Sequence, residues 1–137
     1  MPVKYLWQVP STHQDALPAP KNYQVVFTPQ KDPDVGDLTF MVVNLYPHGG
    51  TTGVHIHPDG DELIFVESGH GVGVEGDTEF ELHPDTVVYA RKGVKHGMTN
   101  TSDQTMRLLC FFAPKMSDER VKSLTENATV KWTGVGK

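Results

Sequence analysis

Two histidines separated by a single residue, His55 and His57, lie in a stretch that has the composition of a β-strand. Residues two apart in a strand point to the same face, so both imidazoles face one way and Ile56 faces the other. Two neutral imidazoles side by side can bind one divalent metal ion. The pair therefore indicates a metal site, and the alternative is an exposed strand that happens to carry two histidines.

A carboxylate and a third imidazole follow further along the chain. Glu62 comes after a turn at residues 58–60 and begins the next apolar run, where it can supply a carboxylate to the same ion. Asp61 is the alternative ligand if the turn is one residue shorter, but Glu62 keeps the following strand in register. His96 follows another turn, at residues 91–93, and begins a further strand.

The elements that must position these residues are short strands from residue 38 onward. β-Branched and aromatic runs alternate with turn signals such as Gly69, Gly76 and Gly93. The expected strands cover residues 38–46, 53–58, 62–67, 71–75, 78–82, 87–90, 96–100 and 106–112. Many short strands with turns between them are typical of a sandwich or barrel. We therefore predict an all-β, single-domain antiparallel β-barrel.

The chain divides into three stretches of one domain: an N-terminal arm (1–36), the barrel core (37–116), and a C-terminal helix and tail (117–137). The arm is rich in Pro and polar residues, with short strands expected around residues 3–9 and 24–27. Ser117 followed by Asp118 and Glu119 is typical of an N-cap with an acidic first turn. One short helix is therefore expected to run to about Glu126, and a further strand around residues 129–132.

Composition narrows the function classes. A chain of 137 residues suits one domain, and a net charge of -5 with scattered basic residues argues against nucleic-acid binding. There is no run of about 20 apolar residues for a membrane span and no basic-then-apolar secretory signal at the start. The single cysteine, Cys110, fits a reducing compartment. We therefore expect a cytoplasmic protein that binds a small molecule, and neither nucleic acid nor a membrane.

The spacing of the candidate ligands resembles the first of two motifs of the cupin superfamily. That motif is Gly, five residues, His-x-His, three or four residues, Glu, six residues and Gly. The residues that match it at every spacing are Gly49, His55, His57, Glu62 and Gly69.

The second cupin motif is matched in part. It is Gly, five residues, Pro-x-Gly, two residues, His, three residues and Asn, and the matching residues are Gly93, His96 and Asn100. Asp85 replaces the first glycine and Arg91 the proline, and both departures affect turns rather than ligands. The resemblance spans residues 49–100.

The resemblance implies an RmlC-like jelly roll of six to eight strands that assembles as a homodimer. It also implies one divalent metal ion per chain (Mn, Fe, Ni or Zn), and the implied ligands are His55, His57, Glu62 and His96. Three neutral imidazoles and one carboxylate leave a net charge of about +1 and open coordination positions. Such a site suits a small keto or hydroxy acid, a diketone or a sugar that chelates the ion.

Four classes of function fit this site. The first is a metal-dependent lyase, isomerase, decarboxylase or cyclase acting on a small oxygenated metabolite, and the second is an Fe(II)-dependent dioxygenase. The third is a non-catalytic module that binds a sugar or carboxylate, and the fourth is a structural dimerisation unit. Open coordination positions are typical of catalytic metal sites, which favours the enzymes.

Further side chains are candidates for the substrate pocket or for catalysis. Met41 and Val43 share one strand face, and Met98 lies two residues after His96 and so faces inward with it. The pocket candidates are Met41, Val43, Met98 and Arg107, for which core packing or a solvent-facing position is the alternative. The candidates for acid–base catalysis are His70 and Tyr89, with Glu67 also conceivable.

Overall fold

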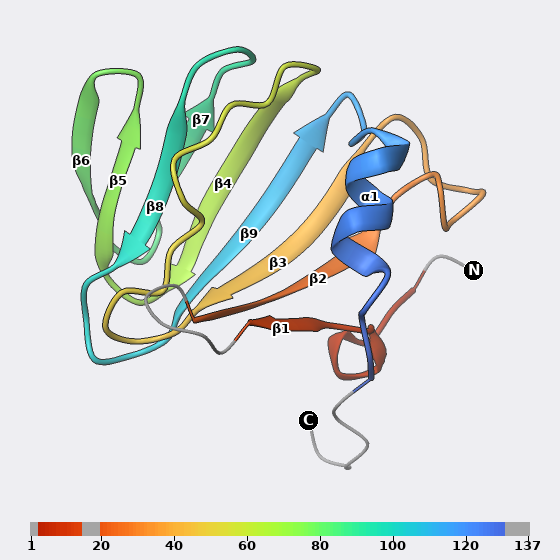
Figure 1. Ribbon diagram of the computed structural model, residues 1–137, viewed down its shortest axis with the longest axis horizontal. Helices are drawn as coiled ribbons and strands as arrows, with labels where there is room; N and C mark the ends of the chain where they lie inside the picture. The colour runs from red at the N-terminus through yellow and green to blue at the C-terminus, as the bar shows by residue number, and fades with distance from the viewer. Residues whose placement is uncertain (1–2, 15–19, 131–137) are drawn as a thin grey trace.

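The computed structural model describes residues 3–14 and 20–130, and Figure 1 shows the arrangement of its elements. The strands are β1 (Thr12–Gln14), β2 (Lys21–Phe27), β3 (Thr39–Leu45), β4 (Asp61–Ser68), β5 (Gly71–Glu75), β6 (Thr78–Leu82), β7 (Val87–Ala90), β8 (His96–Asn100) and β9 (Met106–Ala113). The helices are the 3-10 helix η1 (Leu6–Gln8) and the α-helix α1 (Asp118–Thr125).

Two antiparallel sheets form the body of the molecule. The larger has six strands in the order β1-β2-β3-β9-β4-β7, and the smaller has the order β6-β5-β8. In Figure 1 the smaller sheet lies at one end of the molecule and α1 lies at the other, over β2 and β3. The antiparallel jelly roll expected from the sequence is confirmed. The described residues form nine strands: seven of the eight expected from residue 38 onward, together with β1 and β2, by which the N-terminal arm joins the larger sheet.

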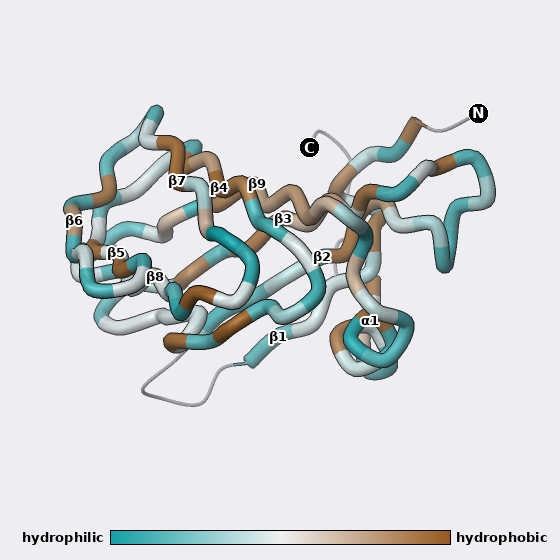
Figure 2. The backbone as a smooth tube through the Cα atoms, turned by 90° about the horizontal axis from the view of Figure 1, so that it is seen from above, coloured by the Kyte–Doolittle hydropathy of each residue, from teal (hydrophilic) through white to brown (hydrophobic). Residues whose placement is uncertain are grey.

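The main core lies on the inner face of the larger sheet. Strand β9 alternates strictly, with Met106, Leu108, Cys110 and Phe112 buried. The hydropathy colouring of Figure 2 shows apolar residues recurring along the central strands β3, β4 and β9. This alternation is what a sheet with one face toward the core requires, and it fixes which side chains can reach the interior.

The N-terminal segment covers part of the outer face of the larger sheet. Val9 packs with Val26 and Val42 in a second, smaller apolar cluster. The prediction of a strand at residues 3–9 is wrong, because η1 occupies part of that range. The side chain of Gln24 binds two backbone carbonyl groups of this segment. Nε2 of Gln24 donates to the oxygen of Leu6 at 2.7 Å and to that of Val9 at 3.0 Å.

The homodimer that the sequence analysis expects stays a prediction.

The helix near the C-terminus begins where the sequence predicts. Oγ of Ser117 accepts a hydrogen bond from the backbone N–H of Arg120 at 3.2 Å, which confirms the N-cap. Val121 is buried, and Thr129 forms a single β-bridge with Ser11 in place of the expected strand. Residues 131 and 132 of that expected strand lie outside the described residues. Over residues 3–14 and 20–130, no helix has both the length and the apolar character to cross a bilayer.

Two turns depend on backbone conformations with positive φ. Gly69, at φ 90°, joins β4 to β5, and a Cβ there would lie 2.5 Å from the Cα of Met106. Asp85, at φ 67°, occupies the motif position where glycine is usual. Aspartate tolerates this region better than most residues, so the turn keeps its conformation despite the replacement.

Candidate metal centre

The segment that carries His55 and His57 does not form the continuous strand expected at residues 53–58. It lies beside β8 through isolated bridges that pair Thr51 with Thr99 and His55 with His96. The alternation nevertheless holds, because His57 is buried whereas Ile56 is 54% exposed. Gly53, at φ 72°, interrupts the extended conformation, which explains why only single bridges form.

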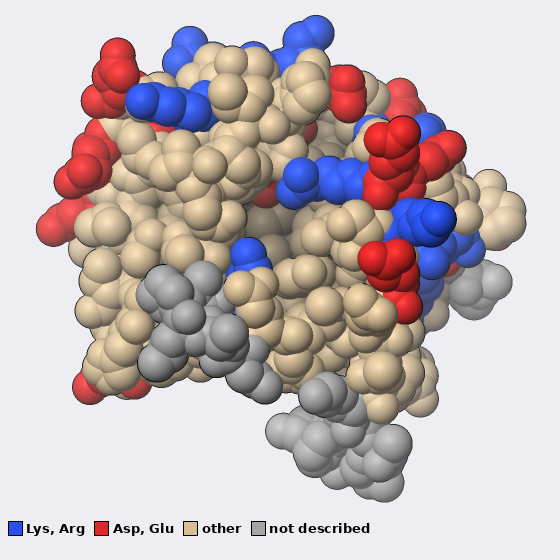
Figure 3. Space-filling view, viewed as in Figure 1, with Lys and Arg blue, Asp and Glu red and all other residues tan. Residues whose placement is uncertain are grey.

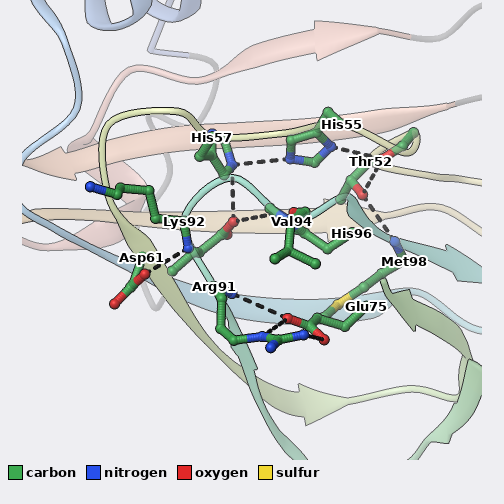
Figure 4. Close-up of polar contacts among 12 residues, drawn as sticks. Thr52, His55, His57, Asp61, Glu75, Arg91, Lys92, Val94, His96 and Met98 are labelled. Atoms are coloured by element: carbon green, nitrogen blue, oxygen red, sulfur yellow. Dashed lines mark hydrogen bonds and ion pairs between the residues drawn. The ribbon is translucent and has the colours of Figure 1, made fainter. Parts of the chain in front are cut away.

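Four side chains from this segment, β4 and β8 converge on one point. Nε2 of His55 lies 3.1 Å from Nε2 of His57, which in turn lies 3.1 Å from Oε1 of Glu62. Nε2 of His96 lies 3.0 Å from the same carboxylate oxygen. Figure 4 shows the three imidazoles turned toward one another.

The spacing of these donor atoms fits a metal ion. One donor atom from each of the four residues lies within 4.8 Å of all the others. Ligands about 2.1 Å from an ion are about 3 Å apart when they occupy adjacent positions, which agrees with the three distances. The chemistry also fits, because three imidazoles and a carboxylate are ligands for Zn, Fe, Ni or Mn. The sequence therefore identified a set of residues that the fold brings together.

Backbone carbonyl groups orient two of the rings. Nδ1 of His55 lies 2.8 Å from the oxygen of Gly53, and Nδ1 of His96 lies 3.2 Å from the oxygen of Val94. A carbonyl can only accept, so each Nδ1 carries a proton. When such a ring is neutral, the lone pair lies on Nε2 and faces the shared centre, as metal binding requires. Without an ion, the contact between Nε2 of His96 and the carboxylate of Glu62 is a hydrogen bond only if that ring holds a second proton, on Nε2.

The buried carboxylate of Glu62 is negatively charged. Burial would raise its pKa, but the hydrogen bonds with His57 and His96 outweigh burial and lower the pKa to about 2. At neutral pH the group therefore carries the charge that a divalent ion needs as a counter-charge.

The pKa values of His55 and His96 are shifted in opposite directions. Burial lowers the pKa of His55 to about 4, so this ring is neutral at physiological pH. Burial also opposes protonation of His96, but its hydrogen bond with Glu62 outweighs that effect and raises the pKa of His96. Protons therefore compete with a metal ion at His96 more than at His55.

Asp61, the alternative carboxylate, points away from the cluster. Its side chain accepts hydrogen bonds from the hydroxyl of Tyr89 and, at 2.7 Å, from the backbone N–H of Lys92. In β4 the buried residues are Glu62, Ile64 and Val66, so the register that favoured Glu62 is the register observed.

The cluster lines a cavity of about 120 Å³ whose other walls are mainly apolar. Of the pocket candidates, Met41, Val43 and Met98 line it, together with Ile64, Leu108, Cys110 and Phe112.

The remaining candidates lie elsewhere. Arg107 borders a separate depression next to the N-terminal segment, and its Nε lies 3.4 Å from a carboxylate oxygen of Glu67. His70 is exposed and its ring packs edge-on against that of His83. Tyr89 is 55% exposed on β7. Among the described residues, none of these candidates lines the cavity with the cluster, so catalytic roles for His70 and Tyr89 stay predictions without geometric support.

Besides Thr52, which lies between Gly49 and His55 in the chain, sequence reasoning missed three polar residues of the cavity. Lys21 and Tyr23 come from β2, and Arg120 comes from α1. All three lie far from Glu62 along the chain, and no motif links them to the cluster. The one local signal is the N-cap at Ser117, which fixes where α1 begins and so which side of the helix Arg120 occupies.

One of the two departures from the second motif, Arg91, lies beside the cluster. Arg91, in place of proline, forms a two-point ion pair with Glu75, with Nε–Oε2 at 2.7 Å and a second contact at 3.0 Å (Figure 4). Glu75 is the strand partner of His96, so this pair lies next to a candidate ligand. Asn100, which matches the motif, is fully buried and its Nδ2 donates to the oxygen of Leu45 at 2.8 Å.

Comparison with known families identifies the chain. The profile described as "Cupin domain" matches residues 41–112, which include all four residues of the cluster. The chain therefore belongs to the cupin family. A comparison with curated protein sequences gives no match.

Several solved structures have a similar fold. A predicted oxalate decarboxylase from Thermotoga maritima has 16% identity, covers 80% of this chain and 96% of its own, and gives a TM-score of 0.70. An RmlC-like cupin from Shewanella frigidimarina has 15% identity, with coverage of 85% and 93% and a TM-score of 0.67. The TT1209 protein from Thermus thermophilus has 24% identity, with coverage of 85% and 100% and a TM-score of 0.66. At these identities the likeness concerns the fold.

Proposed function

We propose that this cupin is a divalent-metal-dependent enzyme of the lyase, isomerase, decarboxylase or cyclase type, acting on a small oxygenated metabolite that chelates the ion. The observation that carries the proposal is the convergence of four donor atoms within 4.8 Å on the wall of a cavity. A site that only stabilised the fold would have no need of a cavity beside it.

The residues of the chain have distinct roles in this proposal. His55, His57, Glu62 and His96 hold the ion, which when bound supplies Lewis-acid stabilisation of enolate or oxyanion charge. The apolar wall that includes Met41 and Met98 excludes water and so strengthens electrostatic interactions in the cavity. Tyr23 has a hydroxyl that can donate or accept a hydrogen bond, which suits it to pass a proton.

The Thermotoga protein supports including decarboxylases in the proposed class. That protein is described as a predicted oxalate decarboxylase, and at 16% identity the likeness carries no substrate to this chain. Decarboxylation of small acids is therefore one reaction to test among others.

The test begins with metal analysis of protein expressed with added Mn, Fe, Ni or Zn. Close to one equivalent of metal per chain is expected, and loss of the metal in His57→Ala would assign it to the cluster. The loaded protein is then incubated without oxygen with small hydroxy and keto acids, and products are followed by NMR. Turnover that needs the metal supports the proposal. Oxygen consumption would indicate a dioxygenase instead, and binding without turnover would indicate a binding module.

A further inference from the structure

The cavity beside the metal cluster holds two basic side chains that the metal does not need. Lys21 of β2 and Arg120 of α1 both line it, on elements outside the cupin profile match at residues 41–112. Figure 3 shows a hollow on the face seen in Figure 1, with Lys and Arg atoms projecting at its edge.

These two cations lack an acidic partner in the described part of the chain. The ion pairs of residues 3–14 and 20–130 involve other basic residues, namely Lys4, His57, His83, Arg91, His96, Arg107 and Lys115. Nε of Arg120 is buried and has no hydrogen-bond partner among the described residues. A buried guanidinium N–H without an acceptor is costly, so an acceptor from a ligand would be favourable there.

The two charges also disfavour each other. Burial lowers the pKa of Lys21, and the positive charge of Arg120 lowers it further. Burial lowers the pKa of Arg120 as well, more than its electrostatic interactions with Glu62 and Tyr23 raise it. Glu62 is the one carboxylate among the described residues that line this cavity, and the metal cluster uses it. The cavity is thus electrostatically complementary to an anion.

We propose that Lys21 and Arg120 form a carboxylate-recognition site, so that the substrate is a small acid with two acidic groups, one that chelates the metal and one that binds this basic pair. The inference rests on the proposed function for the chelating end. The basic pair itself stands on residues of β2 and α1 that hold no metal.

Paired acids that share a chelating end test this proposal. Malate and 2-hydroxybutyrate have the same α-hydroxy acid, and they differ in a distal carboxylate against a methyl group. Tartronate with lactate, and 2-hydroxyglutarate with 2-hydroxyvalerate, extend the comparison to a shorter and a longer reach. Binding to metal-loaded protein is measured by isothermal titration calorimetry at low salt. In at least one of the three pairs, the diacid is expected to bind at least about tenfold more tightly than the monoacid. A charge-assisted hydrogen bond from the basic pair to the distal carboxylate provides a gain of this size.

Variants assign that preference to the two residues. Arg120→Met keeps an apolar stem without the charge, and it is expected to reduce the preference for the diacid to about twofold or less. Lys21→Met provides a second variant should the first fail to fold. Lys122→Met is the matched control, because Lys122 is exposed on the same helix and lies outside the cavity. The Lys122→Met variant should prefer the diacid as strongly as the unchanged protein does.

The outcomes separate this inference from the proposed function. Metal binding with no diacid preference at any length would overturn the inference and leave the metal chemistry intact. Equal loss of preference in Lys122→Met would also overturn it. If no metal binds, the proposed function fails, and the same titrations of the metal-free protein test the inference alone. A salt-sensitive preference for the diacid that Arg120→Met removes would support the inference. The absence of any diacid preference would refute it.

Discussion

Nε2 of His96 lies 3.0 Å from Oε1 of Glu62, although His96 belongs to β8 of the smaller sheet and Glu62 to β4 of the larger. The candidate metal centre therefore joins the two sheets of the jelly roll. A metal ion bound there would stabilise the folded state, because a ligand that binds only that state shifts unfolding to higher temperature.

The variant His57→Ala is expected to lose metal affinity and the thermal stabilisation that metal confers. Removing a residue that only supports a ligand costs roughly 10- to 100-fold in metal affinity, and the loss in His57→Ala should be larger because His57 is a proposed ligand. Competition with a chromophoric chelator and the melting temperature with and without zinc measure the two effects. His83→Ala is the control, since His83 is exposed and contacts Glu81. Equal retention of metal in both variants would contradict the assignment.

Replacement of each of the two neighbouring carboxylates tests which of them is the ligand. Glu62→Gln is expected to weaken metal binding strongly, because an amide supplies no negative charge. Asp61→Asn should retain the metal, since Asp61 binds Tyr89 and the backbone of Lys92 instead. Metal content of the two purified variants gives the answer. Loss of metal from Asp61→Asn alone would reverse the assignment.

Metal affinity is expected to decrease as the pH falls. The raised pKa of His96 means that this ring takes up a proton before His55 does, and a ring protonated on both nitrogens cannot bind metal. His55, with a pKa of about 4, adds to the effect only in strong acid. Chelator competition between about pH 7.5 and pH 5 should show affinity falling toward tenfold per unit for the one competing proton. A flat profile over that range would be inconsistent with the ligand set.

Gly69→Ala is expected to lower the free energy of unfolding by about 2 kcal/mol or more. A residue with a Cβ costs roughly 1–2 kcal/mol in the left-handed conformation, and overlap with a packed neighbour adds to this. That neighbour is Met106, whose Cα lies 2.5 Å from the Cβ position. Gly36→Ala is the control, since Gly36 has nothing within 4 Å of that position. Urea denaturation measures both, and equal stability of the two variants would argue against the turn geometry.

The thiol of Cys110 is expected to be unreactive in the folded protein. Burial raises the pKa of this thiol well above its usual value, and the charge of Glu62 acts in the same direction. Without thiolate there is no nucleophile for a disulfide reagent. The absorbance change with Ellman's reagent should appear only after urea is added. Rapid stoichiometric reaction of the native protein would show that the cavity wall opens readily.

The sequence predicts the metal ligands because their spacing is local. His55 and His57 share a face in any extended segment, and Glu62 begins an apolar strand whose register is set by Ile64 and Val66. The sequence does not predict Lys21 or Arg120 in the cavity, because their approach depends on how β2 and α1 pack around the core. The strand expected at residues 53–58 fails for a local reason, the positive φ of Gly53.

The segment with His55 and His57 is joined to β8 outside any regular strand ladder. His55 and His96 exchange two backbone hydrogen bonds of 2.9 Å, and the oxygen of His57 accepts a third from Gly93 at 2.9 Å. Half of the candidate ligand set therefore comes from one irregular segment, whereas Glu62 and His96 belong to the two sheets. An ion held by all four side chains would tether this segment to both sheets at once.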